Sequence, residues 1–313
     1  MNKLDIKPHV SIIMNCHNSE TYLNEAIDSV LEQTFSDWEL ILWDNNSSDR
    51  TKDIVKEYKD HRIKYFFSEI FCSLGEARNL AIEESKGQLI AFLDSDDLWL
   101  PQKLEQQVPI FNDKKIGIVI CDTIFFNEKG LEKQLYKKGP PPNGSVFRET
   151  LSDYFISLET AIIRKDSLDS LEYWFDTRFQ VIEEYDLFVR LAYKWEIAYV
   201  DKILAKWRVH GSSWTWSKSE LFPIEKKKML KSLSKLIPDF YDSFSIEIKK
   251  VNQGIIIEET KNIWQNKSRK EARRHLVNNF SFNFKFIIIY ILSFLPRKLF
   301  NFFQQLRGAI EPI

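Results

Sequence analysis

Short apolar runs alternate with helix-like segments from residue 10 to residue 121. The runs are rich in Ile, Leu, Val and Phe and continuous enough to be buried on both faces; they cover residues 10–15, 39–43, 63–67, 89–93 and 116–121. Between them, apolar residues recur every three or four positions behind polar caps such as Ser19 and Ser48. The alternation predicts βα units, and therefore an α/β fold with a doubly wound, mostly parallel sheet flanked by helices.

A Gly-Pro-Pro-Pro-Asn run at residues 139–143 interrupts this pattern and predicts a loop. The stretch that follows is expected to complete the same domain, with a strand at 160–164, an amphipathic helix at 183–195 and a returning strand at 203–209. From residue 218 onward the pattern is helical and rich in Lys. We therefore expect one α/β domain over residues 1–217, made of the halves 1–125 and 140–217, and a helical region over residues 218–313.

Composition and charge exclude several classes of protein. Hydrophobic residues make up 44% and charged residues 28% of the chain, which is typical of a globular protein and excludes a disordered or fibrous one. Lys and Arg total 44 against 45 for Asp and Glu, so there is no overall basic field and we expect no nucleic-acid partner. The three cysteines lack metal-ligand spacing, and the apolar run near the N-terminus is too short for a signal peptide, which indicates the cytoplasm.

The end of the chain has a different character, because Phe, Ile and Leu dominate residues 280–308. The nearly uninterrupted apolar stretch at 286–295 is about half as long as the roughly 20 residues needed to span a bilayer. Basic residues flank it: Lys285, Arg297, Lys298 and Arg307. We favour an amphipathic helix lying on an anionic membrane surface, which would make the protein peripheral on the inner face of the cytoplasmic membrane. The alternative is a buried helix that packs on the rest of the protein.

Polar side chains follow three of the predicted strands. The first strand leads into Asn15-Cys16-His17-Asn18, the second into residues 44–49, and the fourth into Asp94-Ser95-Asp96-Asp97. Ligands of open α/β sheets bind beyond the carboxyl ends of the strands, so we expect the site there. Two carboxylates beside a diphosphate suit Mg²⁺ or Mn²⁺. The alternative is a solvated turn in which Asp97 caps the next helix.

The chain contains, in order, the blocks VSIIMNCHN, AIDSVLEQTF, LILWDNNSSD, GEARNLAIEESKGQLIAFLDSDDLWLPQKLE, EEYDLFVRLA and KWRVHGSSW. This series, over residues 10–214, resembles the family 2 glycosyltransferases with the GT-A fold. The resemblance implies an inverting, metal-dependent enzyme that moves a sugar from a nucleotide sugar, expected to be a UDP-sugar, to a hydroxyl of a glycan or lipid-linked acceptor of a bacterial surface polysaccharide. Residues 1–125 would be the nucleotide-binding half and 140–217 the acceptor side.

The resemblance also implies roles for individual residues on the nucleotide side. Asn15, Asn18 and Asp44 would hold the base and ribose, and an Asp carboxylate can accept the uracil N3–H. Arg78 would face the nucleotide or its diphosphate, and Asp94 the ribose or sugar.

Structural alternatives accompany these roles. Asp44 could merely build a turn with Asn45 and Asn46, where the family usually has Asp and Gly, and Arg78 could pair with Glu76 or Glu83 on its own helix.

The remaining implied roles concern the metal and the base. Asp96 would bind Mn²⁺ or Mg²⁺ directly, with His210 near the metal or diphosphate, although a lone His is often only a surface residue. Glu184 would take the proton from the acceptor hydroxyl, in a position where the family commonly has Asp. Acids such as Glu183 at a helix N-terminus could instead only complement the helix dipole, and Asp186 is expected to pair with Arg190.

Three other functions remain to be weighed. A catalytically silent nucleotide-sugar-binding partner in a membrane assembly would not need both Asp96 and Glu184. A dinucleotide oxidoreductase would need a glycine-rich turn, and the chain contains no GxG. A glycoside hydrolase could use Asp96 and Glu184 on either side of the bond, but the nucleotide-side motifs would then be unexplained.

Overall fold

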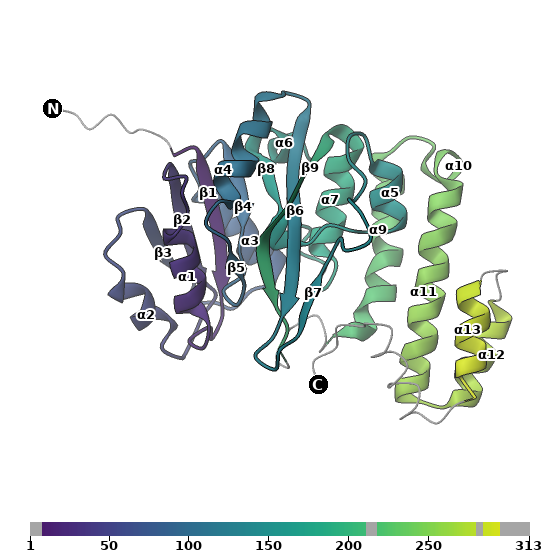
Figure 1. The fold of residues 1–313 in the computed structure, drawn as a ribbon. Helices are drawn as coiled ribbons and strands as arrows, with labels where there is room; N and C mark the ends of the chain where they lie inside the picture. Colours follow the sequence, from purple (N-terminus) through teal and green to yellow (C-terminus); the bar gives the residue numbers. More distant parts are fainter. Residues whose placement is uncertain (1–7, 211–217, 280–283, 295–313) are drawn as a thin grey trace. The chain divides into compact units, whose positions relative to one another are not determined.

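The computed structural model describes residues 8–210, 218–279 and 284–294, shown in Figure 1. Contacts between residues divide the chain into two compact units. The first comprises Met1–Thr150 and Phe155–Arg208, and the second comprises Leu151–Tyr154 and Val209–Ile313. The predicted domain boundary at residue 217 falls outside the described residues.

A nine-stranded sheet in the order β3-β2-β1-β4-β8-β6-β9-β5, with β7 paired to β6, forms the first unit. The strands are β1 (Val10–Cys16), β2 (Trp38–Asp44), β3 (Ile63–Phe67), β4 (Leu89–Phe92), β5 (Leu98–Trp99), β6 (Ile116–Phe126), β7 (Glu132–Gln134), β8 (Ile162–Arg164) and β9 (Glu196–Arg208). Strands β3, β2, β1 and β4 run parallel, β6 and β9 pair in parallel, and β8 joins these two groups by antiparallel pairing. The predicted α/β class with a mostly parallel sheet is confirmed.

Helices connect the strands and flank the sheet. In chain order they are α1 (Leu23–Leu31), α2 (Thr51–Glu57), α3 (Leu74–Glu83), α4 (Lys103–Gln107), the 3-10 helix η1 (Val108–Asn112), α5 (Phe147–Ser152), the 3-10 helix η2 (Leu158–Thr160), α6 (Lys165–Asp169) and α7 (Glu183–Lys194). Strands β1 and β4 are buried along their whole length, as expected for strands covered on both faces. Ser73 caps α3 by accepting the amide N–H of Glu76 at 3.3 Å.

Two strands are much longer than their apolar runs predict. Strand β6 continues from Cys121 to Phe126, and β9 starts at Glu196 rather than at residue 203. The two strands pair along nearly their whole length, with register irregularities around Cys121 and Asp122. Pairing between distant segments therefore extends both strands through polar residues that the hydrophobic pattern leaves out.

The second unit is helical in its described part, as predicted. It contains the 3-10 helix η3 (Ser219–Leu221) and the helices α9 (Phe222–Leu236), α10 (Phe240–Ser243), α11 (Ser245–Asn266), α12 (Arg269–Asn278) and α13 (Phe284–Leu292). Phe286 and Ile289 of α13 pack with Leu276 of α12 and with Ile256 and Ile257 of α11. Of the predicted surface segment 280–308, only residues 284–294 are described.

Candidate active site

The loops that follow β1, β2 and β4 are joined by hydrogen bonds at the carboxyl edge of the sheet. The Asn18 amide N–H donates to Ser47 Oγ at 2.9 Å, and Asn18 Oδ1 accepts the amide N–H of Ser48 at 2.8 Å. The hydroxyl groups of Ser19 and Ser95 lie 2.8 Å apart. The structure thus brings the predicted polar strand ends together.

Asp44, predicted on the nucleotide side, is fully buried at the end of β2. Its carboxylate accepts the amide N–H of Ser47 at 2.8 Å and the hydroxyl of Tyr65 at 2.6 Å. Beside it, the Asn45 side chain donates to the Cys72 carbonyl at 2.9 Å and accepts the Cys72 amide N–H at 3.1 Å. An Asp could not make this pair of bonds because a carboxylate only accepts, so the departure at Asn45 has a structural reason.

Asn15 lies nine-tenths buried at the end of β1. Its amide nitrogen Nδ2 has no hydrogen-bond partner among the described residues. Buried amide donors are nearly always paired in folded proteins. A donor of this kind, at the edge where ligands of parallel sheets bind, fits a position that faces an acceptor atom of a ligand.

Arg78 of α3 is the central cation of the site and is only 3% exposed. Its guanidinium donates to Asp94 Oδ1 at 3.2 Å and to Glu183 Oε1 at 3.0 Å, and it lies 5.4 Å from the centre of the Phe175 ring. The alternative, in which Arg78 pairs with Glu76 or Glu83 on its own helix, is therefore not what the structure shows. Arg78 instead connects the loop after β4 with the start of α7, and its predicted contact with a nucleotide stays a prediction.

The acidic pair Glu183 and Glu184 begins α7. Burial raises the pKa of Glu184 to about 8; Arg78 opposes this rise, while Glu183 and Asp94 add to it. A carboxyl group with such a pKa keeps its proton below about pH 8 and, once deprotonated, is a stronger base than an ordinary carboxylate, which suits a general base. Glu183, expected only to complement the helix dipole, is buried and ion-paired with Arg78.

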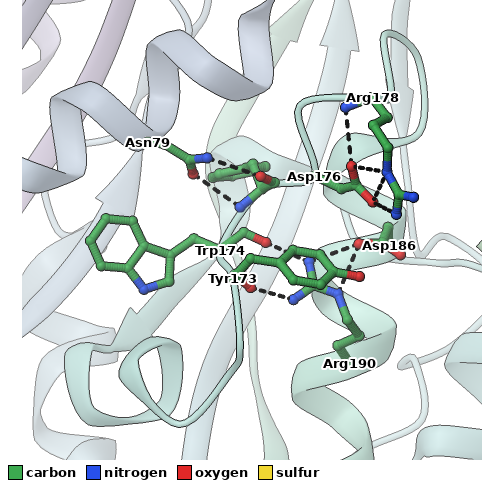
Figure 2. A network of polar contacts seen from close by, with 8 residues as sticks. Asn79, Tyr173, Trp174, Asp176, Arg178, Asp186 and Arg190 are labelled. Carbon is green, nitrogen blue, oxygen red and sulfur yellow. Dashed lines mark hydrogen bonds and ion pairs between the residues drawn. The ribbon is translucent and has the colours of Figure 1, made fainter. Parts of the chain in front are cut away.

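A network of polar contacts fixes the segment that leads into this acidic pair, as Figure 2 shows. Asn79 donates to the Phe175 carbonyl at 2.9 Å and accepts the Phe175 amide N–H at 3.0 Å. Arg190 pairs with Asp186, as predicted, through an Nε to Oδ2 distance of 2.8 Å. The same guanidinium donates to the carbonyls of Tyr173 and Trp174.

Asp94 and Asp96 lie in the loop directly after β4, and the side chain of Asp94 is 39% exposed. Partial burial raises the pKa of Asp94, Arg78 lowers it, and Asp96 raises it. Two carboxylates offer the oxygen ligands that Mg²⁺ and Mn²⁺ prefer, and such cations commonly take their other ligands from phosphates and water. No group of three or more His, Cys, Asp and Glu could hold a metal ion within the part of the chain described. The carboxylates of Asp94 and Asp96 are the oxygen donors that fit such a cation.

His210, the other predicted metal residue, is the last described residue before the gap at 211–217. Strand β9 ends two residues earlier, at Arg208, whose amide N–H donates to Asp97 Oδ1 at 2.8 Å. The backbone thus approaches the 94–97 loop just before His210. The role of His210 near the metal or diphosphate stays a prediction.

The comparison with protein families identifies the class. The model of "Glycosyl transferase family 2" matches residues 11–171. The chain therefore belongs to glycosyltransferase family 2, and the predicted resemblance is confirmed. It is also 33% identical over 166 residues to the UDP-Glc:alpha-D-GlcNAc-diphosphoundecaprenol beta-1,3-glucosyltransferase WfgD of Escherichia coli. That match takes in 53% of this chain and 64% of WfgD, less than two thirds of its length.

Solved structures share the fold at low sequence identity. TarS residues 1–349 of S. aureus, in complex with UDP-GlcNAc, is 19% identical with a TM-score of 0.65, covering 93% of this chain and 82% of that one. The mannosyltransferase PcManGT of Pyrobaculum calidifontis, in complex with GDP-Man and Mn²⁺, is 14% identical with a TM-score of 0.61, covering 98% and 86%. These similarities support the GT-A-type fold.

Sequence reasoning missed residues that hold the site from a distance. Asn79 directly follows Arg78, yet its partner Phe175 lies 96 positions away. Arg208 stands inside a block already noticed for His210, and it contacts Asp96 across 112 positions. The sequence shows only that an Asn or Arg stands next to a predicted buried strand or helix. It does not show which distant residue that side chain contacts.

Proposed function

We propose that the chain is an inverting, metal-assisted glycosyltransferase that moves a sugar from a UDP-sugar to a hydroxyl of a glycan or lipid-linked acceptor in bacterial surface-polysaccharide synthesis. The observation that carries this proposal is the pairing of one buried guanidinium, Arg78, with Asp94 at 3.2 Å and with Glu183 at 3.0 Å. Asp94 belongs to the donor-side loop, and Glu183 adjoins the candidate base. Donor side and base therefore lie on either side of a single side chain.

On the donor side, Asn15, Asn18 and Asp44 surround the edge where the base and ribose would bind. The unpaired amide of Asn15 supports a hydrogen bond to the ligand, and the buried contacts of Asp44 support a role in shaping the loop as well. Arg78 and Asp94 would face the ribose and diphosphate. Asp96 would hold Mn²⁺ or Mg²⁺, which when bound would offset negative charge on the leaving diphosphate, and His210 keeps its proposed role near the metal or diphosphate.

On the acceptor side, Glu184 takes the proton of the attacking hydroxyl. The hydroxyl oxygen forms a bond to the anomeric carbon as the bond from that carbon to the diphosphate oxygen breaks, and UDP leaves on the opposite face. One such displacement inverts the configuration at the anomeric carbon. The raised pKa of Glu184, about 8, supports this role because the carboxylate gains affinity for a proton.

The second unit supports a membrane-surface location for the acceptor step. Helix α13 buries Phe286 and Ile289 against α11 and α12, but it also exposes the apolar side chains of Ile287, Tyr290 and Ile291. Phe294, two residues after the helix, is exposed as well. A helix that is apolar on all sides needs a second apolar environment. Arg269, Lys270 and Arg274 of α12 are exposed, and cations beside an apolar face fit anionic lipid.

None of the described helices is both long enough and apolar enough to pass through a bilayer. From the exposed apolar side chains of α13, we propose that the protein lies peripherally on the inner face of the cytoplasmic membrane, where an acceptor on a lipid carrier would meet it. The diphosphoundecaprenol-linked acceptor in the name of WfgD supports this choice.

Calorimetric titration with UDP, in Mn²⁺ and in EDTA, tests the donor site. Wild-type protein is expected to bind UDP in Mn²⁺, Asp96→Ala to lose most of this affinity, and Glu184→Gln to keep it. If the protein binds GDP or dTDP but not UDP, the proposed donor is wrong and the donor carries that other nucleotide. If it binds none of the three, the proposal is overturned.

A further inference from the structure

Arg208, at the end of β9, is nearly buried and makes contacts in three directions. Its Nε donates to the carbonyl oxygen of Asp96 at 2.9 Å, and its Nη2 donates to Glu25 Oε2 at 2.7 Å. Its own backbone N–H donates to Asp97 Oδ1 at 2.8 Å. One residue thus joins β9, the 94–97 loop and helix α1.

The surroundings of this guanidinium suit arginine and no other cation. Its carbon Cζ lies 4.3 Å from the centre of the Tyr22 ring and 4.6 Å from the centre of the Phe126 ring. A planar guanidinium can stack on aromatic rings while it donates in its own plane to two oxygens, whereas a lysine ammonium cannot do both. The site therefore fixes the orientation of the side chain, and with it the Asp96 carbonyl.

Every residue of the 94–97 loop makes a contact with another part of the chain. Asp94 pairs with Arg78, Ser95 lies against Ser19, and the buried carboxyl of Asp97 accepts the Arg208 N–H. Arg208 supplies the side-chain bond to the backbone of Asp96 itself. Residues that orient a metal ligand from behind affect metal affinity although they never touch the ion.

We propose that Arg208 is a positioning residue that fixes Asp96 for binding of the divalent cation, and that Glu25 acts through Arg208. This inference rests on the proposed role of Asp96. The Nε and Nη2 of Arg208 donate to Asp96 and Glu25, so the role proposed for Arg208 is to position Asp96 and not to contact the substrate.

Two variants test the inference. Arg208→Lys keeps the charge but loses the stacked, two-sided geometry, and Glu25→Gln removes the ion pair at a side chain that is 56% exposed, where the fold tolerates change. UDP affinity is measured by calorimetry over a series of Mn²⁺ concentrations. Hydrogen exchange of the backbone amides at residues 94–99 is measured in the metal-free protein, as a readout that does not depend on activity.

For Arg208→Lys we expect the Mn²⁺ concentration at half-maximal UDP binding to rise about tenfold or more. Excess Mn²⁺ should restore the wild-type UDP affinity, and amide exchange at 94–99 should be faster. Glu25→Gln should show a smaller effect of the same kind. In the double variant it should add nothing to the effect of Arg208→Lys.

Unchanged Mn²⁺ dependence in Arg208→Lys would overturn the inference. A loss of UDP affinity that excess Mn²⁺ does not restore would also overturn it, since this would indicate direct contact with the diphosphate. If Arg208→Lys fails to fold, Glu25→Gln tests the inference through the Mn²⁺ dependence of UDP binding and the amide exchange at residues 94–99. If wild-type protein binds UDP equally well in EDTA, the proposed metal role of Asp96 fails first, which is a separate result.

Discussion

Glu184 combines a position at the first turn of α7 with a pKa of about 8. Below that pH the carboxyl group keeps its proton and cannot accept another from the acceptor hydroxyl. Because kcat/KM reports the free enzyme, we expect it to rise with pH and to level off above about pH 8. Initial rates between pH 5.5 and about 9 at low donor concentration check this. A profile that is already level at the acidic end would contradict the assignment of the base.

Asn46 illustrates how a single backbone angle constrains the nucleotide side. Its φ is +64°, a left-handed conformation that favours Gly and is tolerated by Asn, and it stands where the family usually has Gly. Its side chain is exposed, so little packing is lost on substitution. We expect Asn46→Ala to destabilise the protein by about 1 kcal/mol and Asn46→Gly to be nearly neutral. Urea unfolding measures both, and equal stability of the two variants would argue against strain at this turn.

At the scale of elements, α3 positions the segment before α7 through the pair of bonds between Asn79 and Phe175. Phe175 in turn lies against Arg78 and meets the Phe92 ring edge-on at 5.6 Å between ring centres. Asn79→Ala leaves two backbone groups of Phe175 without these partners, which should cost about 1–3 kcal/mol of the free energy of unfolding. It should also lower kcat, because Arg78 and Glu183 lose their support.

Asn24→Ala is the matched control for this variant, since Asn24 is an exposed asparagine on α1. Its unfolding free energy should stay within about 0.5 kcal/mol of wild type. If Asn79→Ala behaves like Asn24→Ala in urea unfolding and in kcat, the proposed link between α3 and α7 is wrong.

The elements also show what a sequence can reveal about this fold. Apolar runs predicted β1 to β4 closely, and β1 and β4 are buried throughout, as continuous apolar runs indicate. The predicted burial of residues 63–67 was wrong because β3 is a half-buried edge strand. The predicted caps Ser19 and Ser48 were also wrong, since α1 and α2 have no side-chain cap. The pairing of Asp186 with Arg190 was predictable because the two are one helical turn apart. The sequence did not predict the extension of β6 and β9. It also did not predict the contact of Arg208 with Glu25, which lies 183 positions away. Local periodicity carries no information about which distant partners a buried group meets.

On the scale of the whole molecule, the exposed face of α13 makes membrane association testable. Ile291 is 61% exposed on α13, and Ile246 is 67% exposed on α11. We expect the full chain to sediment with vesicles containing anionic lipid and less with neutral vesicles. Ile291→Glu should reduce this binding several-fold, whereas the matched variant Ile246→Glu should not. Equal vesicle binding by both variants would show that α13 is not the part of the protein that contacts the membrane.

Glu184 is proposed to take the proton of the acceptor hydroxyl as the sugar moves from a nucleotide sugar. The most direct measurement is a transfer assay with a panel of UDP-sugars and a lipid-diphosphate-linked sugar acceptor, in which both UDP release and the glycosylated product are quantified. We expect wild-type protein to form the product, Glu184→Asp to keep part of the rate, and Glu184→Gln to lose about 10²-fold or more of it while still binding UDP. Product formation by Glu184→Gln at the wild-type rate would contradict the account.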